Sequence, residues 1–212
     1  MVKTIVGVIV LLIVLALVYI GFIGNNNSDQ KASTSIDKEG GSEKEQLFSR
    51  DGLKTNTAIA SIPLNEVLGG GPKKDGIPAI SNPKFISVSE ALEIENKERQ
   101  GVSVVSGNTA RFYPYSILVW HEIVNDEIED NPIIVTFCPL CGSAIVFDPT
   151  VNGTVREFGV SGKLWQSNLL MYDRTNESLW SQIIGEAVVG DDTETKLEAV
   201  SYTHLTLPTI GC

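Results

Sequence analysis

Basic side chains are scarce in this 212-residue chain, in which Lys and Arg together number 16 while Asp and Glu number 26. The formal net charge is −10. Proteins hold a phosphate backbone or an anionic membrane surface through clusters of Lys and Arg, and no such cluster is present. The composition therefore argues against nucleic acid and anionic lipid as partners, and the excess of acidic residues mainly favours solubility.

Histidine is rarer still, and the motifs of several enzyme classes are missing. The glycine-rich stretch Gly69–Gly76 (GGGPKKDG) has no strand pattern before it and no Gly-Lys-Ser/Thr after it, so it does not match a phosphate-binding loop. No Gly-x-Ser-x-Gly elbow marks a serine nucleophile. A lone internal histidine without such a nucleophile does not define a hydrolase triad.

The chain has one long uncharged apolar run, Thr4–Ile23. As a helix with ~1.5 Å rise per residue, this run is about 30 Å long and matches the hydrocarbon core of a bilayer. It is longer than the apolar core of a cleaved secretory signal and lacks a small-residue exit, so an uncleaved transmembrane anchor (residues 1–23) is the better interpretation. Lys3 favours a cytoplasmic N-terminus, with the rest of the chain facing the periplasm or cell exterior.

Composition divides the remaining chain into three parts. Residues 24–46 are almost without apolar side chains, which predicts a disordered polar tether. Residues 47–200 carry regular apolar patterns and turn signals, and we expect one C-terminally truncated domain there. Residues 201–212 look like a translated sequencing adapter, which predicts a non-native tail whose His204 and Cys212 have no function. A genuine β-prone terminal strand is the alternative that the composition permits.

The domain pattern predicts a mainly β fold, an antiparallel meander with a barrel- or sandwich-like core and a few short helices. Ser87-Val-Ser-Glu90 has the spacing of a capping box and begins a helix. Pro114 opens a second short helix. Asn152-Gly153, between two runs of strand composition, predicts a type I′ hairpin because both central residues of that turn need positive φ.

The credible chemical site is the pair Cys138 and Cys141 in Phe137-Cys-Pro-Leu-Cys-Gly142. Runs of strand composition lead into and out of this motif, so we expect it at the tip of a hairpin. The spacing can bring both sulfurs to one side of a turn, where they could close a disulfide or bind one metal ion. Backbone N–H groups around such a turn tend to point at the sulfurs, which favours thiolate over thiol.

Three interpretations of this pair stay open. The first is thiol–disulfide chemistry, although not on a thioredoxin fold, because the residues after Gly142 begin a helix poorly. The second is a copper or zinc site, in which His121 would be a third ligand and Glu122 or another acidic side chain a fourth. The third is a structural disulfide. Such a disulfide would stabilise the fold only weakly, because the loop that it closes is so small.

His121 is the internal histidine and lies among aromatic residues. A histidine in that context is more often a hydrogen-bonded packing residue than a catalyst. If it approaches the cysteines, it becomes a candidate base or metal ligand.

Six segments of the chain are similar to one family. They are Gly69–Ile80, Ser81–Phe85, Trp120–Asn125, Phe137–Ala144, Phe158–Gly162 and Asn168–Trp180. Together they resemble the family called domain of unknown function 3179, over about residues 61–200. The family has no established reaction. Some members are labelled selenoproteins, and the resemblance implies that the labelled residue falls in the cysteine motif, which favours redox chemistry since selenium gives a nucleophile of lower pKa.

The sequence thus predicts a membrane-anchored, extracytoplasmic protein in which Cys138 and Cys141 cycle between dithiol and disulfide. His121 is the candidate base, and a second protein is the expected redox partner. Binding of copper or zinc by Cys138, Cys141 and His121 is the alternative. A scaffold with a structural disulfide is the second alternative.

Overall fold

The computed structural model describes residues 48–94 and 100–206. The predicted membrane anchor at residues 4–23 and the tether at 24–46 lie outside these ranges, so both remain predictions. Within the two described ranges, no helix is long and apolar enough to cross a membrane.

The described part of the chain is mainly β with a few short helices, which confirms this part of the predicted fold class. The helices are η1 (Leu64–Glu66, a 3-10 helix), α3 (Val88–Ile94) and α4 (Tyr115–His121). The strands are β1 (Leu68–Gly69), β2 (Ile80–Ser81), β3 (Gln100–Ser106), β4 (Thr109–Pro114), β5 (Ile123–Ile128), β6 (Asn131–Cys138), β7 (Ser143–Asp148), β8 (Thr150–Val151), β9 (Thr154–Val155), β10 (Phe158–Trp165), β11 (Asn168–Asp173), β12 (Leu179–Ser181), β13 (Glu186–Val189), β14 (Glu198–Ala199) and β15 (Tyr202–Thr206).

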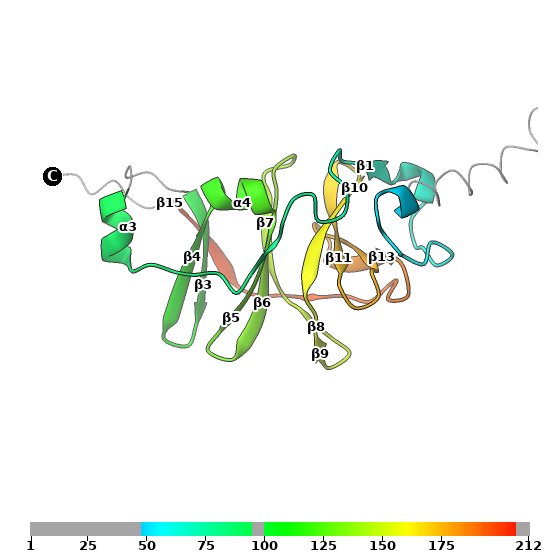
Figure 1. The fold of residues 1–212 in the computed structure, drawn as a ribbon. Coiled ribbons are helices and arrows are strands. Elements are labelled where there is room, and N and C mark those ends of the chain that lie inside the picture. Colours follow the sequence, from blue (N-terminus) through cyan, green and yellow to red (C-terminus); the bar gives the residue numbers. More distant parts are fainter. Residues whose placement is uncertain (1–47, 95–99, 207–212) are drawn as a thin grey trace, which may run out of the picture. The chain divides into compact units, whose positions relative to one another are not determined.

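Three sheets and one small hairpin organise these strands (Figure 1). Sheet A has the order β1-β10-β11-β12-β13, sheet B the order β14-β7-β6-β5-β2, and sheet C the order β15-β3-β4, while β8 and β9 form the hairpin. The pairs are antiparallel except for β2 and β5, which run parallel. Most neighbours in a sheet are also neighbours in sequence, as expected of a meander.

Local sequence signals account for several of these boundaries. The amide of Ser87 donates to Glu90 Oε2 at 2.8 Å and the amide of Glu90 donates to Ser87 Oγ at 3.3 Å, so the predicted capping box begins α3. Asn152 and Gly153 have φ of 51° and 76°, which confirms the predicted positive-φ hairpin turn between β8 and β9. Pro114 precedes α4 as predicted.

Sheet B is buried on both faces, because sheet A covers one face and sheet C with α4 covers the other (Figure 1). Successive side chains of a strand point to opposite faces. Along β6, Ile134 and Cys138 therefore pack with residues of sheet A, while Val135 and Phe137 pack with residues of sheet C and α4. This two-sided burial explains why the sequence of β6 is almost uniformly apolar.

The predicted non-native tail overlaps β15, which pairs antiparallel with β3, for example Tyr202 with Val104. The Tyr202 hydroxyl also donates to the carbonyl of Ala144. Backbone pairing is open to any segment of strand composition, so the pairing does not distinguish a tail of foreign origin from a genuine terminal strand. The non-native origin of residues 201–212 stays a prediction.

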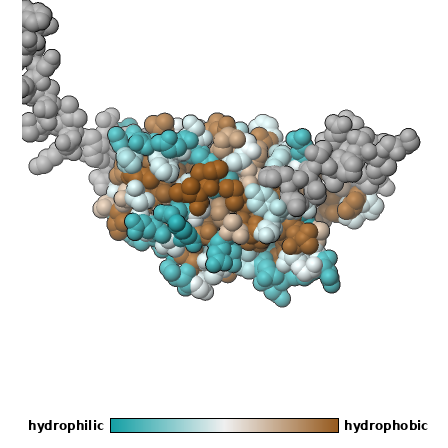
Figure 2. Space-filling model, turned by 180° about the vertical axis from the view of Figure 1, so that it is seen from behind, coloured by the Kyte–Doolittle hydropathy of each residue, from teal (hydrophilic) through white to brown (hydrophobic). Residues whose placement is uncertain are grey.

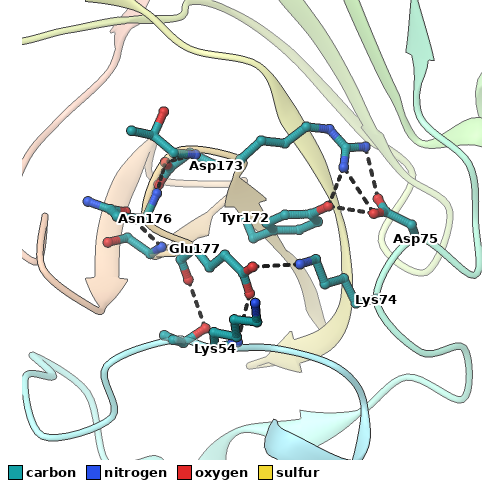
Figure 3. A network of polar contacts seen from close by, with 11 residues as sticks. Lys54, Lys74, Asp75, Tyr172, Asp173, Asn176 and Glu177 are labelled. Carbon is teal, nitrogen blue, oxygen red and sulfur yellow. Dashed lines mark hydrogen bonds and ion pairs between the residues drawn. The ribbon is translucent and has the colours of Figure 1, made fainter.

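A polar network ties the segment before β2 to sheet A (Figure 3). The Tyr172 hydroxyl donates to Asp75 Oδ2 at 2.6 Å, and the Arg174 guanidinium donates to both Asp75 oxygens at 3.0 Å. Lys74 Nζ lies 2.7 Å from Glu177 Oε1. Burial raises the pKa of Asp75, but the bonds from Arg174 and Tyr172 outweigh that effect and hold the pKa below its ordinary value.

We expect Asp75→Ala to lower the free energy of unfolding by about 1–2 kcal/mol at pH 7, because the buried Tyr172 hydroxyl loses its acceptor. The ion pair itself adds little, since Asp75 and Arg174 are partly exposed. An unfolded carboxyl titrates near pH 4 (about 3.9), and the folded pKa lies lower. The stabilisation is therefore present above about pH 4 and is lost as the pH falls through the folded pKa.

Urea denaturation of wild type and variant across pH 3–7, in about five steps, measures this difference. Glu198→Ala, on the exposed strand β14, is the control and should change stability by less than about 0.5 kcal/mol. A difference between wild type and Asp75→Ala that is independent of pH would contradict the role of the Asp75 carboxylate.

Candidate functional site

The two cysteines lie at the tip of the β6–β7 hairpin, as predicted. Cys138 ends β6 and pairs with Ser143, the first residue of β7. The amide of Gly142 donates to the carbonyl of Cys138 at 2.9 Å and closes the turn. Gly142 has φ of 63°, a conformation that glycine adopts without steric cost.

The two thiols are both free but differ in exposure. Cys138 is 1% exposed and belongs to the apolar cluster between sheets A and B. Cys141 is exposed at the tip. Cys141 Sγ lies 3.9 Å from the carbonyl oxygen of Cys138, and each thiol shifts the pKa of the other, so the structure brings the two predicted site residues together.

Side chains from two strands contact the exposed sulfur. Asn168 Nδ2 donates to Cys141 Sγ at 3.3 Å, and Ser143 Oγ lies 3.0 Å from the same atom. Asn168 is the first residue of β11 and is only 5% exposed. A hydrogen-bond donor from sheet A is therefore held against a cysteine of sheet B.

Gln182, which follows β12 and is fully buried, connects these groups. Its Oε1 accepts from Asn168 Nδ2 at 2.8 Å and from Ser143 Oγ at 3.1 Å. Its Nε2 donates to Thr136 Oγ1 at 3.1 Å. We call Thr136, Ser143, Asn168 and Gln182 the amide network.

These contacts separate the pKa values of the two thiols. Burial raises the pKa of Cys138, and its interaction with the Cys141 thiol raises it further, against the opposing effect of the Cys141 and Leu169 amides. Burial also raises the pKa of Cys141, but its polar contacts with Ser143, Asn168 and Cys138 outweigh that effect, so the net pKa is lowered. Cys141 is thus the better thiolate.

His121 forms a hydrogen-bond contact with the backbone away from the two cysteines. Its Nδ1 lies 2.7 Å from the carbonyl oxygen of Pro78, a bond that ties the end of α4 to the segment before β2. The structure does not bring it into hydrogen-bond contact with Cys138 or Cys141. Its neighbour Glu122 has φ of 60°, where the chain leaves α4 for β5, and burial raises the pKa of Glu122 to about 7.

Residues 48–94 and 100–206 contain no group of three or more His, Cys, Asp and Glu side chains that could hold a metal ion. Within these ranges, no third His, Cys, Asp or Glu side chain joins Cys138 and Cys141 in a set that could hold copper or zinc. The thiolates themselves suit a soft metal, so metal binding remains the alternative to redox chemistry.

Sequence reasoning missed the amide network as part of the site. Asn168 and Gln182 border apolar runs, and their polar character in that context is the signal that the sequence offers. Asn168 lies 27 positions after Cys141. The packing of sheet A against sheet B brings the two residues together, and the sequence does not encode that packing locally.

A family model described as "Protein of unknown function (DUF3179)" matches residues 74–210, which include the two cysteines and the whole amide network. The chain belongs to this family. The resemblance noted in the sequence is thereby confirmed, and the DUF3179 match covers the cysteine hairpin together with sheet A strands β10 to β13. Searches of the curated proteins and of the solved structures gave no match.

We expect native alkylation to distinguish the two thiols of this DUF3179 chain. In a Cys212→Ser background, the Cys138→Ser variant should react with iodoacetamide at neutral pH, because its remaining thiol is exposed and has a lowered pKa. The Cys141→Ser variant should react at least about tenfold more slowly, limited by opening of the fold. Mass spectrometry of timed samples measures both rates.

The pH dependence supplies a second check. The rate for Cys141 should have its midpoint below the ordinary thiol value of about pH 8.5. Equal rates for both variants in the native state, and equal midpoints, would show that the difference between the two thiols is not real. The same reaction in urea, where both thiols are exposed, is the control.

Proposed function

We propose that this domain is a thiol–disulfide oxidoreductase in which Cys141 is the attacking thiolate and Cys138 the resolving thiol. The observation that carries the proposal is the difference between the two thiols. Cys141 is exposed and accepts a hydrogen bond from Asn168, while Cys138 is 1% exposed. Thiol exchange needs an accessible thiolate to form the mixed disulfide and a second thiol within reach to release it.

In one direction, the Cys141 thiolate attacks a sulfur of a partner disulfide. The partner disulfide bond breaks, a mixed disulfide forms, and one partner thiolate leaves. Cys138 then loses its proton to that leaving thiolate and attacks Cys141 Sγ, which forms the Cys138–Cys141 disulfide and releases the second partner thiolate. The partner gains two electrons and the domain loses two, and the reverse sequence is equally balanced.

The arrangement differs from that of a thioredoxin-type site. There the thiolate benefits from the N-terminus of a helix, whereas Cys141 lies at a hairpin tip, accepts a bond from the Asn168 amide and lies 3.0 Å from the Ser143 hydroxyl oxygen. The order of the two cysteines is also reversed, since the second of them is exposed. Both differences follow from the position of Cys138 at the inward-facing end of β6.

A partner protein fits the surroundings of the exposed sulfur as substrate. Leu140 precedes Cys141 and is 67% exposed, and Ile183, whose amide bonds Asn168, is 49% exposed. Apolar side chains reach the molecular surface among hydrophilic ones (Figure 2). Exposed apolar groups beside a reactive thiol can pack against the chain that carries the partner cysteines.

The same proposal includes the location of the domain. The apolar run 4–23 would anchor the chain, and Lys3 before it favours a domain outside the cytoplasm. That compartment is oxidising, so a functional thiol pair there exchanges with partners rather than staying permanently reduced.

We expect the Cys212→Ser chain, full length and in detergent, to form the Cys138–Cys141 disulfide reversibly in glutathione buffers. Acid quenching, alkylation and mass spectrometry measure the fractions of dithiol and disulfide. With oxidised glutathione, Cys138→Ser should accumulate a mixed disulfide at Cys141 at least about tenfold faster than Cys141→Ser does at Cys138, because only Cys141 is exposed.

Two outcomes would overturn the proposal. A reduction potential below about −300 mV would mark an inert structural disulfide. Stoichiometric copper or zinc in the reduced protein, lost from a Cys138→Ser, Cys141→Ser double variant, would instead establish the metal-binding alternative.

A further inference from the structure

The orientation of the Asn168 side chain is fixed by its neighbours. The backbone amide of Ile183 donates to Asn168 Oδ1 at 3.0 Å, and a backbone N–H can only donate. The oxygen of the side chain must therefore face Ile183. Asn168 Nδ2 then faces Cys141 Sγ at 3.3 Å and Gln182 Oε1 at 2.8 Å, with one hydrogen for each.

Gln182 is fixed in the same way from its other end. The Thr136 hydroxyl donates to the carbonyl of Ile145 at 2.7 Å, so Thr136 Oγ1 accepts from Gln182 Nε2 at 3.1 Å. Gln182 Nε2 also lies 3.4 Å from the carbonyl oxygen of Ser143. Gln182 Oε1 must then face Asn168. If the Asn168 amide were flipped, its oxygen would face Gln182 Oε1, and two acceptors would repel each other.

Two backbone groups thus fix the orientation of the two side-chain amides in the network. The Ile145 carbonyl sets Thr136 and Gln182, and the Ile183 amide sets Asn168. Both amide side chains are buried, Asn168 at 5% and Gln182 at 0% exposure, where an amide turned the wrong way would leave polar groups without hydrogen-bond partners at a cost in free energy. The Cys141 sulfur therefore faces a donor that cannot rotate away.

A fixed donor does not stabilise the two redox states equally. A thiolate carries a full negative charge and forms a charge-assisted hydrogen bond, whereas a disulfide sulfur is neutral and a weak acceptor. The bond from Asn168 is therefore stronger in the dithiol state than in the disulfide state. An interaction that favours the reduced form makes the disulfide a stronger oxidant.

We propose that Asn168, held in place by Gln182, sets the redox equilibrium of the Cys138–Cys141 pair, and that the domain accepts electrons from dithiols of partner proteins. This inference rests on the proposed function and gives that function a direction. Asn168 is a positioning residue that acts through the Cys141 sulfur.

The oxidising reaction balances without a further reactant. A substrate thiolate attacks Cys141 Sγ, the Cys138–Cys141 bond breaks, and Cys138 takes up a proton. The second substrate thiolate attacks the substrate sulfur of the mixed disulfide, so the substrate disulfide forms and Cys141 leaves as the thiolate that Asn168 stabilises. The substrate loses two electrons and the domain gains two.

The test compares Asn168→Asp with wild type, both in the Cys212→Ser background and full length. The aspartate keeps an oxygen for the Ile183 amide but replaces the donor to Cys141 with a negative oxygen. We expect the equilibrium constant with glutathione to shift at least tenfold toward the disulfide, a potential about 30 mV more negative. The alkylation midpoint of Cys141 should rise by about one pH unit, the same tenfold factor.

Two further variants keep the result interpretable. Asn168→Ala, which removes the donor without adding charge, should shift both quantities in the same direction and serves if Asn168→Asp fails to fold by circular dichroism. Asn131→Asp makes the same chemical change at the opposite end of β6 and should leave both unchanged. A purely structural role for Asn168 would lower stability without moving potential and midpoint together.

The outcomes also separate this inference from the proposed function. If wild type forms no reversible disulfide, the proposed function fails. If wild type cycles but folded Asn168→Asp and Asn168→Ala keep its equilibrium constant, this inference alone is overturned. The oxidised wild-type chain should also convert a peptide with two cysteines to its disulfide, and a failure to do so while glutathione exchange proceeds would reject the oxidising direction.

Discussion

Gln182 joins the two main sheets at the point where the cysteines lie, and the geometry of the site depends on it. Its amide bonds Thr136 and Ser143 of sheet B and Asn168 of sheet A, and it is fully buried. A buried amide must have its donors and acceptors satisfied, so the strands that supply those partners are held in one register. The position of Asn168 relative to Cys141 follows from that constraint.

The two-sided burial of sheet B determines which cysteine is exposed. Side chains of β6 alternate between the two covered faces of sheet B. Cys138 lies on the same face as Ile134, toward sheet A. Cys141 lies within the turn, where it is exposed. In this strand–turn–strand motif the first cysteine is therefore the buried one, whereas in a helical Cys-x-x-Cys the helix N-terminus lowers the pKa of the first thiol.

Local features of the fold were predictable from the sequence because their causes are local. The capping box at Ser87, the helix start after Pro114 and the turn at Asn152-Gly153 each depend on residues within a few positions of one another. The cysteine hairpin belongs to the same class. Asn168 and Gln182 do not, since their roles depend on which strands of sheet A face the hairpin, and no local pattern encodes that pairing. His121 illustrates the same limit, because its partner, Pro78, lies 43 positions away.

In the proposed thiol–disulfide exchange, two small free energies act on the cysteine pair in opposite directions. Closing the loop between Cys138 and Cys141 removes little entropy from the unfolded chain, because the loop is so short, so the disulfide gains little from that source. A charge-assisted hydrogen bond to the Cys141 thiolate contributes roughly twice as much as a neutral one, and the disulfide gives up this difference. In the proposed reaction this difference favours the dithiol, so the one contact between Asn168 Nδ2 and Cys141 Sγ bears directly on the direction of electron transfer.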